Sequence, residues 1–317
     1  RSAARMFLHL GDPQQALKVV RDHPNFRGDP RMVSADVAIA SRTNQPLRSA
    51  KHGLVMLEDA NFRPSFLCEL AAALGTVELE YGKHKRSRAL FSRSMLIPSE
   101  NALAQVQWAT ERDSFITIPA EAWQVPGSYE AHALAARQRL DWDSVLDAAE
   151  HWLNEEPFAI RPAMLGSFAS FTSDQNQRAE RLVSQALMSN PESASLYNNR
   201  AVARAYLGDM AGAIEDVRKA VEPGIEHQPY AIATVGLIGY RSGDHVLGAM
   251  GYKAAIAHFV KQKNAPSTLL ASLFWLRELA RIGDSSAASD FEYVRKNALR
   301  FTGGKPDPEI QSMLDAI

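Results

Sequence analysis

The sequence of 317 residues is poor in cysteine, with Cys68 as its single example. One thiol excludes an intramolecular disulfide and a zinc site built from cysteines. An unpaired thiol fits the cytosol, which is the compartment that we expect, although a periplasmic protein without disulfides would have the same composition. Cysteine usage therefore excludes a disulfide framework and leaves these two compartments open.

Long apolar runs are also missing. No stretch of about 18 or more residues is apolar throughout, so we expect no membrane span. No signal peptide is recognisable at the start of the chain. The chain begins with Arg1 inside a helical pattern rather than with methionine. We therefore expect a fragment or a processed product of a longer chain.

The sequence also lacks an excess of charge of either sign. The formal net charge is −1, whereas a nucleic-acid binder usually carries a strong basic excess. We therefore expect no nucleic-acid partner. Residues 83–88 (KHKRSR, the basic run) are the main local exception. No aromatic residues alternate with these bases, so the run is interpreted as a solvated face, with an anion or partner contact as the alternative.

Catalytic and metal signatures are not found. The sequence has no GxSxG, no GxxxxGK[ST] and no HExxH motif, which removes the common hydrolase, nucleotide and zinc-protease patterns. His151 and Glu155 are spaced to share a helical face, but no third ligand accompanies them. Gly236, Gly239 and Gly243 lack the preceding strand of a phosphate-binding loop. We predict no enzymatic activity, no metal and no cofactor.

The sequence does contain a repeated pattern of small residues. Residues 194–221 (ASLYNNRAVARAYLGDMAGAIEDVRKAV) place Ala201, Gly208 and Ala213 at steps of 7 and 5. Ala201 and Ala213 have little bulk, so two helices can cross closely there. Gly208 can take the left-handed conformation that ends the first helix, and Asp209 can cap the second. This stretch predicts a helical hairpin.

The same triplet recurs along most of the chain. Successive first members are separated by 34, 37, 58, 34, 34, 35 and 40 residues. The triplets are Ala4/Gly11/Ala16, Ala38/Gln45/Ala50, Gly75/Gly82/Ser87, Ala133/Leu140/Val145, Ser167/Asp174/Ala179, Ala201/Gly208/Ala213, Gly236/Gly243/Gly248 and Leu276/Gly283/Ala288.

This pattern resembles the tetratricopeptide (TPR) repeat, a hairpin of about 34 residues. The resemblance covers about residues 1–98 and 126–300. It implies an all-α fold, a right-handed superhelical α-solenoid of TPR-like helix-turn-helix repeats, because one hairpin cannot bury its apolar face alone. The expected division is 1–98 (N-terminal TPR-like repeats), 99–128 (a degenerate repeat or bend), 129–300 (C-terminal TPR-like repeats) and 301–317 (a capping helix).

The section 99–128 breaks the period. Only 58 residues separate Gly75 from Ala133, where two repeats need about 68. We therefore expect the fourth hairpin to lack most of its second helix. Its apolar residues are predicted to fill the gap, with a docking surface as the alternative; they are Phe115, Ile116, Ile118, Trp123 and Val125.

In TPR proteins the stacked first helices line a concave groove that holds a peptide or a partner's helix. Carried over to this sequence, the groove set holds five arginines, one acid and several aromatic residues, and such residues dominate binding energy at interfaces. Arginine can hold a carboxylate through two parallel hydrogen bonds. The resemblance therefore implies a protein or peptide partner with acidic and apolar groups, unless the aromatic residues only fill space between helices. The candidate binding residues are Arg137, Arg161, Phe168, Phe171, Asn198, Tyr206, Tyr230, Tyr240, Arg241, Arg277 and Arg281.

Several functions remain open. The leading one is a protein-interaction scaffold, and the alternative is the sensor or regulatory arm of a larger signalling or effector protein whose other domain precedes Arg1. A free-standing enzyme and an RNA-binding helical repeat are weaker readings. A homo-oligomer is possible through the end repeats or through Phe274 and Trp275, which equally fit a core position.

Overall fold

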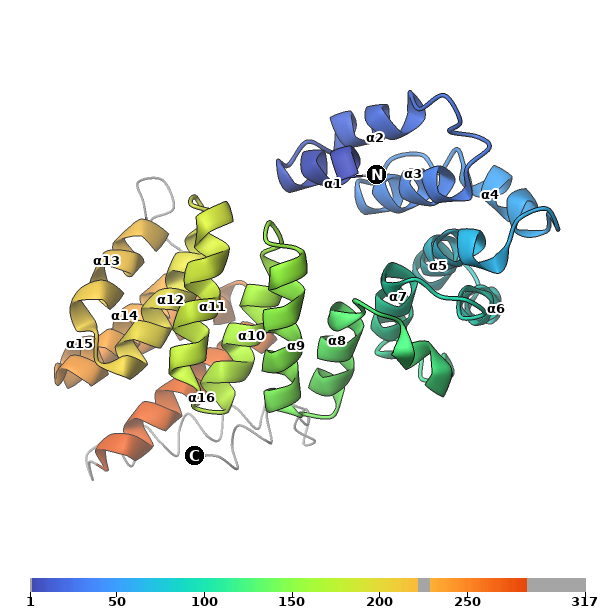
Figure 1. Ribbon diagram of the computed structural model, residues 1–317. Coiled ribbons are helices and arrows are strands. Elements are labelled where there is room, and N and C mark those ends of the chain that lie inside the picture. Colours follow the sequence, from blue (N-terminus) through green and yellow to red (C-terminus); the bar gives the residue numbers. More distant parts are fainter. Residues whose placement is uncertain (1, 222–228, 284–317) are drawn as a thin grey trace. The chain divides into compact units, whose positions relative to one another are not determined.

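The protein is described by a computed structural model over residues 2–221 and 229–283. These residues form sixteen α-helices and one 3-10 helix, and they contain no strand (Figure 1). The expected all-α solenoid of TPR-like hairpins is confirmed. The second helix of the last repeat and the capping helix 301–317 lie outside the described residues. The chain divides into two compact units, unit 1 (1–139) and unit 2 (140–317), whereas the fourfold division predicted above follows the repeats and stays a prediction.

Unit 1 is a series of hairpins in which the first helices pack on one another from α3 onward. Helices α3, α5 and α7 contact one another in turn, and α8 packs directly on α7. The elements are α1 (Ser2–His9), α2 (Pro13–Arg21), α3 (Pro30–Arg42), α4 (Ala50–Leu57), α5 (Pro64–Tyr81), α6 (His84–Ser94), α7 (Glu100–Thr110), the 3-10 helix η1 (Ala120–Gln124) and α8 (Tyr129–Gln138).

The fourth hairpin of unit 1 lacks a full second helix, as the shortened period predicts. The short η1 stands in its place. Ile116 is buried, and Trp123 and Val125 pack on the core around Leu103, so these residues fill the gap. Phe115 differs from them, because it is 73% exposed and the Arg88 guanidinium lies 4.4 Å from its ring centroid.

Unit 2 repeats the hairpin more regularly. The first helices α10, α12, α14 and α16 contact one another in sequence and form one layer (Figure 1). The elements are α9 (Trp142–Glu155), α10 (Arg161–Thr172), α11 (Asn176–Ser189), α12 (Ala194–Leu207), α13 (Met210–Ala220), α14 (Pro229–Ser242), α15 (His245–Lys261) and α16 (Ala265–Ile282).

Most hairpins turn through a left-handed residue, with or without glycine, whereas Gly82 between α5 and α6 has a φ of −124°. Gly208 ends α12 with φ of 86°, as predicted. Leu140 and Asp174 occupy the same place with φ of 59° although they carry side chains, a conformation that L-residues adopt at a cost. In the second repeat the left-handed residue is Asn44, one position before the expected Gln45.

An aspartate then starts several of the second helices. Asp12, Asp141, Asp209 and Asp244 each directly follow the left-handed residue, and each carboxylate accepts a backbone N–H three residues further on. These bonds satisfy a helix N-terminus that would otherwise leave its N–H groups unpaired. In these four hairpins the left-handed residue and the aspartate cap together determine where the chain reverses direction.

The α14–α15 crossing is so tight that the two backbones touch. A Cβ atom added to Gly239 would lie 2.5 Å from the backbone nitrogen of Gly248. One added to Gly251 would lie 2.6 Å from the backbone nitrogen of Gly236. Glycine is therefore required at this crossing. The triplet spacing singled out Gly236 and Gly248 and missed Gly251.

Candidate functional site

A cleft of about 220 Å³ opens along the first-helix layer of unit 2. Its walls come from α10, α12, α14 and α16, with two aromatic rings contributed by α15. Four of the predicted binding residues line it, namely Phe168, Phe171, Asn198 and Tyr230. The other lining residues are Met164, Asn199, Val202, Ala233, Thr234, Leu237, Tyr252, Phe259, Ser267, Leu270, Ala271 and Phe274.

A few polar groups bridge neighbouring helices beside this apolar wall. The Asn198 carbonyl oxygen accepts a hydrogen bond from the Thr234 hydroxyl at 2.8 Å, between α12 and α14. The Tyr230 and Ser267 hydroxyls lie 2.6 Å apart, between α14 and α16. Polar atoms thus join successive helices while the surrounding surface is apolar. Such a mixture is typical of sites that bind apolar groups and orient them by a few polar contacts.

Tyr206 lies next to the cleft between two arginines. The guanidinium carbons of Arg241 and Arg277 stand 4.7 and 5.0 Å from its ring centroid. Its hydroxyl oxygen is buried and has no hydrogen-bond partner among the described residues. Burial raises the pKa of this phenol well above its ordinary value. The uncharged ring therefore packs against two cations, which an aromatic ring attracts.

Glu278 neutralises two of the predicted binding arginines. Its side chain is 0% exposed, and it accepts hydrogen bonds from Arg241 at 2.7 Å and from Arg281 at 3.0 Å. A fully buried carboxylate needs such partners. The sequence analysis placed Arg241 and Arg281 in the groove but missed Glu278, which is not on the predicted groove face of its helix.

Arg277 ties the last described helix to a distant one. It donates to the backbone carbonyl of Phe171 at 2.7 Å and to the Asp174 carboxylate at 3.0 Å. These acceptors lie at the C-terminal end of α10, where a helix attracts positive charge. Arg277 therefore fastens α16 to α10, and we call this contact the Arg277 clasp.

The remaining predicted residues lie apart from the cleft wall. Tyr240 is buried at 3% exposure and accepts a hydrogen bond from Trp275. Trp275 is 2% exposed and therefore a core residue rather than a pairing surface. Arg161 is exposed with its guanidinium 5.3 Å from the Trp152 ring centroid. Arg137 belongs to unit 1, near the end of α8. Their role in binding stays a prediction.

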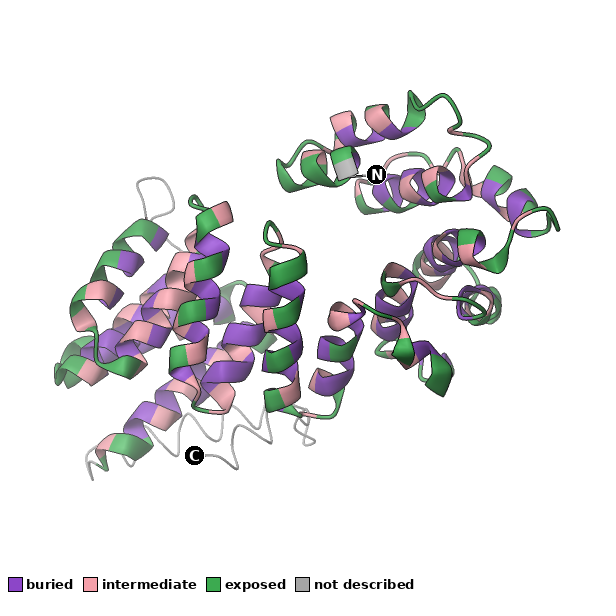
Figure 2. Cartoon of the chain, in the orientation of Figure 1, coloured by how far each residue is buried: buried purple, intermediate pink, exposed green. Residues whose placement is uncertain are grey.

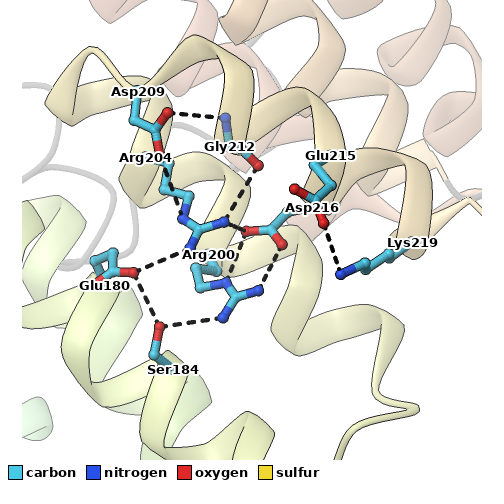
Figure 3. A network of polar contacts seen from close by, with 9 residues as sticks. All are labelled: Glu180, Ser184, Arg200, Arg204, Asp209, Gly212, Glu215, Asp216 and Lys219. Atoms are coloured by element: carbon cyan, nitrogen blue, oxygen red, sulfur yellow. Dashed lines mark hydrogen bonds and ion pairs between the residues drawn. The ribbon is translucent and has the colours of Figure 1, made fainter.

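Behind the first-helix layer, a network of charges joins α11, α12 and α13 (Figure 3). Asp216, with a side chain 0% exposed, accepts from Arg200 at 2.8 and 2.8 Å and from Arg204 at 2.9 Å. Arg200 also donates to Ser184, and Arg204 pairs with Glu180. The hydrogen bonds to Asp216 raise the pKa of the Arg200 guanidinium. This network is structural, because its members satisfy one another.

The basic run of unit 1 is paired within the fold more than its sequence suggests. Arg88 and His84 both contact Asp113, at 2.8 and 3.2 Å, and Arg86 pairs with Glu78 at 3.1 Å. The Arg88 hydrogen bond holds the pKa of the Asp113 carboxyl at about 2, below its ordinary value and against the effect of burial. Much of the run is therefore engaged inside the unit.

No cluster of metal-ligating side chains is formed among the described residues. Within the same ranges, none of the helices has the length and apolar character needed to cross a bilayer.

Comparisons with known proteins find similarities of different extent. Over 57 residues the chain is 49% identical to human tetratricopeptide repeat protein 36, a match that covers 18% of this chain and 30% of that protein. The chain thus spans less than a third of that relative's length. A solved tetratricopeptide repeat protein from Parabacteroides merdae covers 85% of this chain and is itself covered over 96%, with 14% identity and a TM-score of 0.37. No family model matches the chain. The local identity confirms the TPR resemblance expected from the triplets.

Proposed function

Because the chain is built of TPR-like hairpins, a fold that serves in general as a protein-interaction scaffold, we propose that the cleft of unit 2 binds a partner protein through a short apolar segment. The size of the cleft carries this proposal. Sites for drug-sized molecules enclose roughly 300–1,000 Å³, whereas this cleft encloses about 220 Å³. That space suits one or two bulky side chains of a peptide and is small for a cofactor.

The chemistry of the walls supports the choice of an apolar anchor. Phe168, Phe274 and Leu270 present partly exposed apolar surface to the cleft. Burying such surface against a partner's side chain contributes about 25 cal/mol for each Å² removed from water. The module is proposed to act by binding, without catalysis of its own.

Acidic groups of the partner are proposed to contribute less to binding than its apolar anchor. Arg277 and Arg281 keep 29% and 41% of their side chains exposed while holding internal acceptors. An acidic residue beside the apolar anchor would add a partly screened attraction of at most about 1 kcal/mol. Affinity is therefore expected to depend mainly on the apolar anchor, with acidity as a secondary preference.

A peptide selection tests this function. The full chain is used to select binders from a library of random peptides, and the enriched peptides are titrated by fluorescence anisotropy. Leu270→Trp fills the cleft and is expected to weaken binding at least about tenfold. Ile214→Trp is the matched control, because Ile214 is 41% exposed on α13 and does not line the cleft.

Enriched peptides are expected to share a bulky apolar residue. The proposal fails if no peptide is enriched, or if Leu270→Trp binds the selected peptides as tightly as the unchanged chain. Circular dichroism melting of both variants verifies that each one remains folded.

A further inference from the structure

One side of α15 presents an apolar surface to solvent. Val246, Met250 and Val260 are 72%, 64% and 50% exposed, and Ala254 and Ala257 are exposed as well. Their spacing places these five residues along one side of the helix. We call these five residues the α15 stripe, and Figure 2 colours the exposed positions of α15 green. The stripe extends over most of a helix about 25 Å long.

Other second helices of unit 2 expose mainly polar residues, with Met188 on α11 and Ile214 on α13 as single exposed large apolar residues. Helix α13 exposes Glu215, Arg218 and Lys219, and α11 exposes Gln177 and Arg181. Scattered exposed apolar residues are ordinary, but several along one side of a helix mark an interaction site, and the exposed Lys253 lies on that same side. The α15 stripe is also separate from the cleft, because none of its five residues lines that cleft.

The charged side chains of α15 itself have one sign. Helix α15 contains no acidic residue, and it carries His245, Lys253 and Lys261, with Lys263 just beyond its end. The nearest acid in sequence, Asp244, uses its carboxylate to cap the first turn of the helix. In a chain with a net charge of −1, this basic border is a local property of α15. It attracts an anionic partner.

The border argues against a second copy of this chain as the partner. Two α15 helices packed together would bring lysines of both copies to one interface, and like charges there are costly. The stripe also lacks exposed aromatic residues, which interfacial membrane helices commonly use to insert between lipids. Met250 is an adaptable contact residue, and Ala254 and Ala257 lower the surface beside it. A protruding methionine beside two small alanines allows a helix of a partner to pack closely on α15.

We propose that the α15 stripe binds an amphipathic helix of a partner protein. The apolar face of that helix packs on Met250 and Val260, and its acidic side chains meet Lys261 and Lys263. The unit then has two separate contact surfaces, the cleft on the first-helix layer and the stripe on a second helix. One partner can occupy each.

A designed peptide probes the stripe directly. The probe has about 18 residues, with leucines three and four apart on one face and glutamates on the other, and it carries a fluorescent label. Anisotropy titration with the full chain is expected to show binding in the micromolar range at about 50 mM salt. Binding should weaken several-fold at about 500 mM salt, because salt screens the charge pairs.

Variants locate the contact. Met250→Glu places a carboxylate in the middle of the stripe and is expected to weaken binding at least about tenfold, while Lys261→Glu weakens it about threefold. Met188→Glu is the matched control, because Met188 is 84% exposed on α11. The cleft variant Leu270→Trp should leave this binding unchanged. That result separates the stripe from the proposed function of the cleft.

Several outcomes overturn the proposal. One is a Met250→Glu chain that binds the probe as well as the unchanged chain, and another is equal binding of a probe whose glutamates are replaced by lysines. A dimer in sedimentation velocity that dissociates on Met250→Glu would assign the stripe to a second copy. Sedimentation with anionic vesicles that is lost on Met250→Glu would assign it to a lipid surface.

Discussion

Two adjacent hairpins of unit 2 satisfy the same spacing pattern by different physical means. In α12–α13, Ala201 and Ala213 are fully buried at the crossing, and Asp216 is held there by two arginines of α12. In α14–α15 the crossing consists of glycines, and the backbones touch. Buried ion pairs therefore link the helices of one hairpin, and direct backbone packing links the helices of the other.

The difference teaches that small residues set only how near two helices approach. In α12–α13 the alanine methyl groups keep the backbones slightly apart, and the buried ion pairs fix the register of the helices. In α14–α15 close backbone contact and the Tyr240–Tyr252 ring contact take the place of a buried ion pair. Helix α15 itself contains no acidic residue.

The largest expected effect comes from removing the charge that holds α12–α13. Asp216→Ala leaves Arg200 and Arg204 without their main partner, and their side chains are only 16% and 22% exposed. We expect a loss of about 3 kcal/mol in the free energy of unfolding, measured by urea denaturation. Glu215→Ala is the control, because Glu215 is 65% exposed, and it should change stability by less than about 0.5 kcal/mol. Equal effects would refute the distinction between the two hairpins.

A methyl group at the glycine crossing should have the next largest effect. Gly251→Ala forces α14 and α15 apart, and we expect a net loss of about 2 kcal/mol after allowing for the better helix propensity of alanine. Gly243→Ala meets no atom within 4 Å but must hold φ near 87°, which costs about 1 kcal/mol. Urea denaturation of both variants compares the cost of a steric clash at Gly251 with the cost of an unfavourable φ at Gly243. A Gly251→Ala chain as stable as the unchanged chain would contradict the tight crossing.

Unit 1 offers a pH test of the same arginine–aspartate arrangement. The pKa of Asp113 is held at about 2 in the folded chain, below its ordinary value near 4. Since the folded pKa is the lower one, the stabilisation is complete above about pH 4 and is lost as pH falls toward 2. The difference in urea midpoint between the unchanged chain and Asp113→Asn should therefore shrink across this window. A constant difference would contradict the pairing.

The smallest expected effect concerns a hydroxyl. Tyr206→Phe keeps the ring between Arg241 and Arg277 and removes a buried oxygen that has no partner among the described residues. We expect no loss of stability and a gain of up to about 1 kcal/mol, measured by thermal melting. Tyr206→Leu is the companion variant, since it removes the ring itself and should lower the melting temperature. A loss on Tyr206→Phe would show that the hydroxyl holds a partner such as water.

Local features of the fold were predictable from the sequence. The steps of 7 and 5 located the turns at Leu140 and Asp174, where no glycine signals them. In the second repeat the same spacing erred by one residue, because Asn44 tolerates the left-handed region better than Gln45 does. Short-range backbone geometry and spacing therefore define the hairpins.

The candidate site was predictable only in part. Helical periodicity brought Phe168, Phe171, Asn198 and Tyr230 to the cleft. It did not reveal that Glu278 would neutralise arginines on its own and a neighbouring helix, because ion pairing depends on how side chains reach across helices. The Arg277 contact with Asp174 joins residues 103 apart in sequence, which no repeat spacing encodes.

The Arg277 clasp gives unit 2 a property that a simple stack of hairpins lacks. A stack can fray from its terminal repeat, one hairpin at a time. Here Arg277 joins α16 directly to α10, so moving α16 away from the stack also breaks two hydrogen bonds to a helix that is not its neighbour in the repeat order. Opening of unit 2 at α16 is thereby coupled to the C-terminal end of α10, which no neighbour-to-neighbour contact would provide.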